Sequence, residues 1–213
     1  TGKVMTLAAA IEEKKITPET VLTIPYALKR SVKTFHDHEP HPTQRLTTAG
    51  VLAVSSNTGS IKIGEMLSND KLYEYLTKFG IGTKTGSGLP GESRGILPKV
   101  ADWSGTTAPT VAFGQGYSLT AMQATSVFAT VANDGVRVSP TVIAGTSDSS
   151  GNYTPSATRE SVRVISAETA AQMRLMMESV VSANGTAPSA AIPGYRVAGK
   201  TGTAQRIDDT CGC

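Results

Sequence analysis

The chain has 213 residues, which is enough for one domain with a hydrophobic core, and its composition is that of an ordinary globular protein. Its 20 Lys and Arg residues nearly balance 17 Asp and Glu residues and are scattered along the chain, so nothing indicates a nucleic-acid-binding surface. No apolar run approaches the roughly 20 residues that a membrane-spanning helix needs.

The first element expected is a helix from Val4 to Glu13, which is rich in Ala and Leu and begins directly at Lys3. Thr17-Pro18 marks its end, because proline disfavours a helix across the preceding residue. Residues 20–45 show no clear period, and we expect them to be irregular.

Three histidines fall within this irregular stretch, among acidic residues and prolines: His36, His38 and His41, with Asp37 and Glu39. Such a cluster could bind a metal ion, because these side chains are its usual ligands. The favoured interpretation is a solvated loop, since no regular element would hold the side chains in place.

Three helices are then expected, at Thr47 to Val54, Lys71 to Phe79 and Thr120 to Asn133. The last is the clearest, because Thr120 and Gln123 match a capping box and Gly135 provides a stop. The stretch from Gly80 to Pro98 is rich in glycine and proline and is expected to be a loop.

The remaining elements are mixed. Val136 to Ala144 and Val162 to Ile165 have the composition of strands, and the polar stretch 146–152 between them is expected to be a turn or exposed loop. Ser166 should cap a long amphipathic helix with one apolar face made by Ala170, Met173, Met177 and Val180. Tyr195 to Gln205 is expected to be a strand.

With helices early and strands late, the pattern predicts an α+β fold over residues 1–213. Residues 1–135 would form a mainly helical part, and residues 136–213 would form a part associated with a sheet.

The only cysteines are Cys211 and Cys213, close to the end of the printed sequence. They could form a disulfide, with each other or with residues elsewhere, or contribute half of a metal site. Both alternatives stay open, and no redox compartment follows from them.

Three short motifs carry the chemistry: Lys3, Ser55-Ser56-Asn57 and Lys200-Thr201-Gly202-Thr203. Lys3 could act as a general base for a nucleophile one helical turn earlier, which would stand immediately before Thr1. The pKa of a base lysine must be lowered, and burial or a second cation such as Lys200 would lower it.

The other motif residues suit the rest of an acyl transfer. Ser55 could relay a proton to a leaving amine, and Asn57 could donate to a substrate carbonyl and accept from Lys3. Alone, Ser55-Ser56-Asn57 is also a common helix-capping turn.

The motif that begins at Lys200 is expected on a strand edge. Lys200 and Thr201 would hold a substrate carboxylate, Gly202 would allow close approach of a substrate backbone, and the Thr203 N–H would face an oxyanion. The same tripeptide at Lys84-Thr85-Gly86 lies in the glycine-rich loop with no strand expected, so we reject it as catalytic.

These motifs have the order S-x-x-K, S-x-N and K-T-G, and the chain resembles the transpeptidase domain of a class B penicillin-binding protein of the septal, actinobacterial type. Further stretches across the chain carry the same resemblance. They are Leu52 to Gly59, Leu89 to Ser93, Trp103 to Thr107, Phe113 to Gly116, Ala132 to Gly135 and Val197 to Gln205.

The resemblance implies a D,D-transpeptidase that cross-links D-Ala-D-Ala stem peptides of peptidoglycan through a serine acyl-enzyme. β-Lactams would acylate the same serine, and no metal or organic cofactor is implied. The implied fold is a helical subdomain beside a five-stranded antiparallel sheet flanked by helices. The implied location is the extracytoplasmic face of the bacterial plasma membrane, anchored by a segment not in this chain, with cell-division or cell-wall synthesis proteins as partners.

Two departures from the family qualify this expectation. The nucleophilic serine is not in the chain, and the family continues beyond K-T-G with further strands and a helix. We therefore expect these residues to be a segment of a longer or cleaved protein, with an incomplete sheet and no turnover on its own.

Three other functions share the motifs. A β-lactamase would need a water-activating element such as E-x-x-L-N, which is not evident between Asn57 and Lys200. A D,D-carboxypeptidase would use water instead of an amine as acceptor. A penicillin-binding sensor or scaffold would be non-catalytic.

Overall fold

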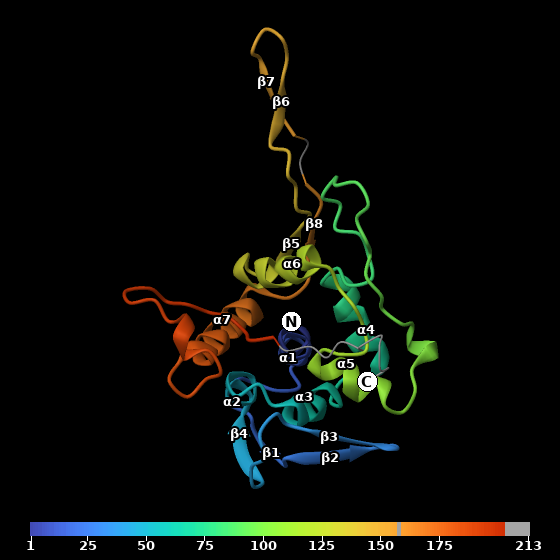
Figure 1. Ribbon diagram of the computed structural model, residues 1–213, viewed down its shortest axis with the longest axis vertical. Helices are drawn as coiled ribbons and strands as arrows, with labels where there is room; N and C mark the ends of the chain where they lie inside the picture. Colours follow the sequence, from blue (N-terminus) through green and yellow to red (C-terminus); the bar gives the residue numbers. More distant parts are fainter. Residues whose placement is uncertain (157–158, 203–213) are drawn as a thin grey trace, which may run out of the picture.

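The helices of the protein pack around α1 (Gly2–Glu12), which lies near the centre of the molecule in Figure 1. The computed structural model describes residues 1–156 and 159–202. α1 is buried along most of its length and contacts α3, α4, α5 and α7. Its run of Ala, Leu and Met is small and apolar enough to pack on all sides, as in an internal helix. The helix predicted at the start of the chain is confirmed.

Six more helices occur in the described residues. They are α2 (Thr48–Ala53), α3 (Asn57–Gly64), α4 (Asn69–Lys78), α5 (Thr107–Phe113), α6 (Ala121–Ala132) and α7 (Ala167–Val181). Short 3-10 turns cover Val100–Asp102 and Pro188–Ala190. The helices predicted near residues 47–54, 71–79, 120–133 and after Ser166 are confirmed. α3 and α5 were not predicted, because both are short and contain β-branched residues together with glycine in α3 and Pro109 in α5, which have low helix propensity.

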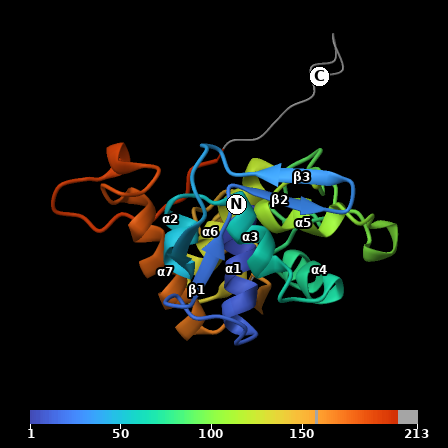
Figure 2. The ribbon, with the colours of Figure 1, turned by 90° about the horizontal axis from the view of Figure 1, so that it is seen from below.

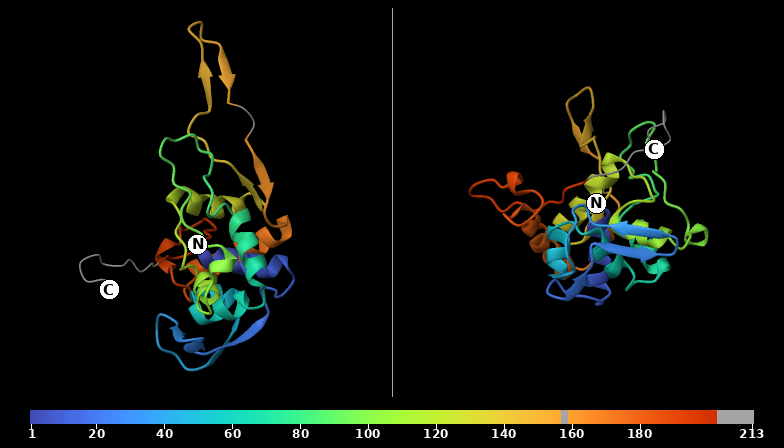
Figure 3. Two further views of the ribbon diagram at one scale, coloured as in Figure 1. Left: turned by 90° about the vertical axis from the view of Figure 1, so that its right-hand side faces the viewer. Right: turned by 60° about the horizontal axis from the view of Figure 1, so that its bottom comes forward.

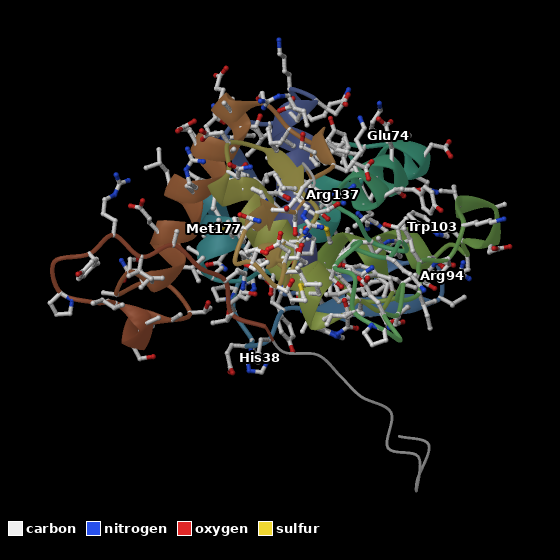
Figure 4. All side chains as sticks on the ribbon, turned by 90° about the horizontal axis from the view of Figure 1, so that it is seen from above. His38, Glu74, Arg94, Trp103, Arg137 and Met177 are labelled. Atoms are coloured by element: carbon white, nitrogen blue, oxygen red, sulfur yellow. The ribbon has the colours of Figure 1, made fainter. Side chains whose placement is uncertain are left out.

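Local capping sets the ends of the two clearest helices. Thr120 and Gln123 form the predicted capping box at the start of α6, and Gly135 adopts a left-handed conformation with φ of 81° just after it. The Ser166 side chain accepts a hydrogen bond from the Thr169 N–H at the start of α7. The predicted apolar face of α7 is buried, including Met177, which Figure 4 shows directed into the molecule.

Two antiparallel pairs replace the irregular region expected at residues 20–45, so that prediction is wrong. β1 (Val21–Ile24) pairs with β4 (Gln44–Thr47), and β2 (Ala27–Arg30) pairs with β3 (Lys33–His36). Figure 2 shows β2 and β3 running side by side on one flank of the helices. Each strand has four residues, so its alternation is too short to detect, and pairing gives the stability that the sequence of one strand lacks.

The later strands are shorter than predicted. β5 (Val136–Val138) pairs with β8 (Ser161–Arg163). The observed strand β5 therefore covers only the first three residues of the range 136–144 in which a strand was expected. β6 (Gly145–Ser147) and β7 (Tyr153–Pro155) form a hairpin around the turn expected in the polar stretch 146–152. Figures 1 and 3 show this hairpin projecting from the body of the molecule.

The strand predicted over Tyr195 to Gln205 is wrong for residues 195–202, which have no regular secondary structure. A strand needs a hydrogen-bonded neighbour, and none of the described strands pairs with these residues. The described strands form four two-stranded sheets, and an incomplete sheet was expected for these residues. Residues 203–205 of the predicted strand, which include Thr203, lie outside the described residues, as do Cys211 and Cys213.

The fold class is α+β as predicted, but strands occur in both halves of the chain. One hydrophobic core crosses residue 135, because Val127 and Val131 belong to the same cluster as Ile165 and Met173. The same cluster contains Leu7, so α1 lies at the centre of packing for both parts. In the portion of the chain that the structure describes, no helix has the length and apolar character to cross a bilayer.

Candidate active site

Ser55 lies in the tight connection between α2 and α3, where two lysines from distant parts of the chain meet. Its Oγ accepts a hydrogen bond from Lys3 Nζ at 3.1 Å and one from Lys200 Nζ at 2.7 Å. Ser55 also has a φ of 59°, in the left-handed region that non-glycine residues rarely adopt. Such strain persists where surrounding contacts determine it, and it clusters at functional sites.

Lys3 is on the first turn of α1 and is half-buried. The pKa of Lys3 is lowered from the usual 10.5 to about 8, mainly by burial and also by the positive charge of Lys200, whereas Asp37 opposes the shift. Burial also lowers the pKa of Lys200 to about 8. Both effects that the sequence analysis required of a base lysine are therefore present.

Lys200 and Thr201 reach the site from an extended segment that follows α7. Lys200 Nζ donates to Thr201 Oγ1 at 3.0 Å, and this hydroxyl lies 2.8 Å from Thr186 Oγ1. The Thr186 N–H in turn donates to Ala53 O, at the end of α2. Gly202 is exposed, with open space where a Cβ would stand, so a ligand backbone could approach it. The segment is thus fixed to the Ser55 connection without being a strand.

Asn57 is oriented differently from expectation. It is the first residue of α3, and its Nδ2 donates to the His36 backbone carbonyl at 2.9 Å. Among the described residues it has no hydrogen bond to Lys3, so the predicted contact between them is wrong. His36 is the last residue of β3, which lies beside α3, and its backbone carbonyl accepts the hydrogen bond from the Asn57 amide. β3 was not predicted from the sequence.

Ser56, the middle residue of the motif, caps α3, because its Oγ accepts from the Gly59 N–H at 2.9 Å. The capping turn and the chemical motif are therefore the same structure.

The histidines do not all lie in a solvated loop. His36 belongs to β3, and the His41 ring is largely enclosed and bonded to Asp37 at 3.0 Å. His38 is exposed beside Glu39, at the edge of the molecule in Figure 4, and His36 is exposed as well. The structure groups no three or more His, Cys, Asp or Glu side chains around a common point within residues 1–156 and 159–202.

The second Lys-Thr-Gly tripeptide lies in a loop, as expected. Thr85 donates to Glu92 Oε1 through its backbone N–H at 2.7 Å, and also through its hydroxyl. Thr85 is buried by these contacts, and neither Lys3 nor Ser55 has a hydrogen bond to this loop. The arrangement stabilises the loop and places no cation at Ser55.

The close approach of α5 to the start of α1 was not predicted from the sequence. A Cβ on Gly2 would stand 2.1 Å from Gly114 Cα and 2.7 Å from the hydroxyl of Tyr117, which is buried without a hydrogen-bond partner in the described structure. Two glycines so distant in sequence give no local signal of contact. The contact fixes the end of α1 that carries Lys3.

Comparison with known proteins shows the family of the chain. The family model for the penicillin binding protein transpeptidase domain matches residues 1–213. The chain belongs to the penicillin-binding transpeptidase family. Its assignment rests on the whole chain and not on the three motifs alone.

Relatives within this family include mycobacterial proteins. The chain is 43% identical to penicillin-binding protein PbpB of Mycolicibacterium smegmatis, covering 100% of this chain and 34% of that protein. It is 41% identical to PbpB of Mycobacterium tuberculosis, covering 100% of this chain and 32% of that protein. The chain thus spans about a third of the length of these curated relatives.

Solved structures of the family have the same fold. Penicillin binding protein 3 from Mycobacterium tuberculosis, complexed with aztreonam, superposes with a TM-score of 0.96 at 40% identity, covering 100% of this chain and 49% of that chain. A peptidoglycan synthetase from Bifidobacterium adolescentis superposes with a TM-score of 0.86 at 33% identity, covering 95% of this chain and 38% of that chain.

Proposed function

We propose that the protein containing this chain is a peptidoglycan D,D-transpeptidase that works through a serine acyl-enzyme and is a covalent target of β-lactams. The observation that carries the proposal is Ser55 Oγ, held between Lys3 and Lys200 at 3.1 and 2.7 Å. One hydroxyl between two lysines of lowered pKa can pass a proton in either direction.

In the proposed reaction, a serine immediately before Thr1 attacks the carbonyl between the two terminal D-alanines. Lys3 in its neutral form accepts the serine proton as the C–O bond forms. The C–N bond then breaks, and the leaving D-alanine amine takes the Ser55 proton, which a neighbouring lysine replaces. The amine of a second stem peptide then attacks the acyl carbonyl and forms a C–N bond. The C–O bond to the serine breaks, and the proton that the amine loses returns to the serine oxygen.

Substrate binding is proposed at the segment around Lys200. The Lys200 ammonium and the Thr201 hydroxyl, 3.0 Å apart, form a pair of donors suited to a terminal carboxylate. Asn57 would donate to a substrate carbonyl after its amide leaves His36 O. Gly202 would lie against the substrate backbone, and the Thr203 N–H would stabilise the oxyanion; Thr203 lies outside the described residues.

The proposed setting follows from the substrate. Peptidoglycan lies outside the plasma membrane, so we place the protein on its extracytoplasmic face, anchored by a segment outside this chain. A relative, peptidoglycan D,D-transpeptidase FtsI of Escherichia coli, is 33% identical over 97% of this chain, which supports a role in peptidoglycan synthesis. We propose cell-division or cell-wall synthesis proteins as partners. The proposed mechanism uses no metal or organic cofactor.

The test is the mass of the full-length protein and of its peptides, with and without a penicillin. A penicilloyl adduct on the peptide joined to Thr1-Gly2-Lys3 is expected. No adduct in folded protein would leave a non-catalytic scaffold and refute the proposal. With stem peptides as substrate, a cross-linked product supports a transpeptidase, whereas release of D-alanine alone would indicate a carboxypeptidase. Rapid loss of the penicilloyl group would indicate a β-lactamase.

A further inference from the structure

Asp37 lies directly behind the Ser55-Ser56-Asn57 motif and accepts hydrogen bonds from several of its atoms. Its Oδ1 accepts from the backbone N–H groups of Asn57 at 2.5 Å and Thr58 at 2.9 Å, and its Oδ2 accepts from Ser56 Oγ at 2.7 Å. Its side chain is only 8% exposed. The carboxylate thus fixes the backbone that carries Ser55 and Asn57. Its negative charge also interacts favourably with the positive, N-terminal end of α3.

His41 completes the environment of this carboxylate. Its Nε2 lies 3.0 Å from Asp37 Oδ2, and its Nδ1 lies 2.7 Å from the Pro42 carbonyl oxygen. A carboxylate and a carbonyl can only accept, so both ring nitrogens must donate, and only the imidazolium has two N–H groups. The geometry therefore calls for a positively charged His41.

We propose that Asp37 and His41 form a charged positioning pair that holds the Ser55-Ser56-Asn57 turn in its reactive geometry. The inference rests on the proposed function for what the turn does, and it adds two residues that lie outside the three motifs. Neither residue touches Ser55 Oγ, so both act through the turn. Protonated His41 donates to Asp37 and balances its negative charge, while Asp37 also accepts from Ser56 and from the first N–H groups of α3.

Few other charged or titratable groups face this pair. Lys3 is close enough for Asp37 to raise its pKa, against the larger effects of burial and Lys200. The Tyr26 ring contacts His41 edge-on with centroids 5.8 Å apart, and it also packs on His36 at 5.2 Å. The remaining groups bonded to the pair in the described structure are uncharged hydroxyls, backbone N–H groups and the Pro42 carbonyl.

The pair makes the turn sensitive to pH. The hydrogen bond to the Pro42 carbonyl, followed by Asp37, raises the pKa of His41 above 6.5. A group whose pKa is raised by folding contributes stability that is fully present below its unfolded value and is lost as pH rises through its folded value. Removal of His41 should therefore matter most at acidic and neutral pH and least at alkaline pH.

The test compares acylation of the full-length wild type, His41→Gln, Asp37→Asn and His38→Gln by a fluorescent penicillin between pH 5.5 and 9. Asp37→Asn should acylate at least about tenfold more slowly, because small misplacements of reacting groups cost large factors in rate. The ratio of the His41→Gln rate to the wild-type rate should be well below one at pH 6 and rise towards one as pH increases. His38→Gln, on the same loop but exposed, should stay within twofold of wild type at every pH.

Thermal melting of the same proteins over the same pH range gives a readout that does not depend on acylation. The melting temperature of wild type should exceed that of His41→Gln by an amount that shrinks as pH rises. A rate ratio and a melting difference that are both independent of pH would overturn the inference, as would Asp37→Asn acylating within twofold of wild type. If wild type itself is not acylated, the proposed function fails, and the melting difference alone decides whether the charged pair holds the turn.

Discussion

Lys200 donates a hydrogen bond to Ser55 Oγ over 2.7 Å, although 145 residues separate them in the sequence. Lys3, which precedes Ser55 by 52 residues in the sequence, donates to the same oxygen. Two ammonium groups at one hydroxyl repel each other, and burial keeps solvent from screening them. The cost of this arrangement is relieved when one lysine loses its proton, which is the state that a general base requires.

The first prediction concerns Lys3 as the base. Lys3→Met and Lys3→Arg should both acylate with a β-lactam about 10² to 10⁴ times more slowly than wild type, measured as the second-order rate constant on full-length protein. Arg keeps the positive charge but cannot give up its proton, so it separates basicity from charge. The exposed Lys15, just beyond the end of α1, provides the control variant Lys15→Met, which should react normally. Retention of a rate within tenfold by Lys3→Arg would exclude Lys3 as the base.

The second prediction concerns pH and Lys200. The acylation rate of wild type should increase with pH through about 8, where Lys3 loses its proton. Lys200→Gln removes a charge that lowers the pKa of Lys3, so the midpoint of this acid limb should move to higher pH. The matched control is Lys84→Gln, in the second Lys-Thr-Gly tripeptide, which should leave the midpoint and the rate unchanged. A shift with Lys84→Gln, or no shift with Lys200→Gln, would contradict the assignment of the two tripeptides.

The third prediction concerns the contact between Gly2 and Gly114. Gly2→Ala would place a methyl group 2.1 Å from Gly114 Cα, so the start of α1 and the end of α5 must separate. Overpacking of this kind costs about 1 to 3 kcal/mol of stability, and it should also slow acylation because Lys3 moves with α1. Gly199→Ala is the control for stability, because its Cβ would meet open space. Thermal melting and penicillin binding together check the result, and a Gly2→Ala protein as stable as Gly199→Ala would show that the contact is not close.

The fourth prediction concerns Gln123, which is fully buried at the start of α6. Its Nε2 faces the carbonyl oxygens of Gly80, Thr83 and Arg94 at 3.1, 2.7 and 2.9 Å, while its Oε1 accepts from the Thr120 N–H. Gln123→Glu keeps the acceptor and replaces the donor with an oxygen that these carbonyls repel.

We expect Gln123→Glu to lower the free energy of unfolding by about 2 kcal/mol or more, since buried acceptors lose their donor. Gln172→Glu, at a half-buried position on α7, is the matched control and should change stability by less than about 0.5 kcal/mol. Chemical denaturation of both variants measures the difference, and equal stabilities would mean that Gln123 does not connect the 80–95 loop to α6.

Much of the helical framework could be predicted because its signals are local. The Thr120–Gln123 capping box, the Ser166 cap and the apolar face of α7 each depend on residues within a few positions of one another. Strands need partners from elsewhere, so the four-residue strands β1 to β4 were missed and the strand expected after Tyr195 does not form within residues 195–202.

The sequence by itself determined which residue types are available for the proposed acyl transfer: Lys3, the Ser55-Ser56-Asn57 turn and the tripeptide that begins at Lys200. Their order and spacing were enough to indicate the family, because each motif is a short run of neighbouring residues that can be recognised without tertiary contacts. Only the tertiary structure decided that both lysines converge on Ser55 Oγ, that Asn57 faces His36 instead of Lys3, and that Asp37 and His41 support the turn. These relationships depend on packing between segments distant in sequence, and a lysine acquires a pKa near 8 only when that packing removes it from water.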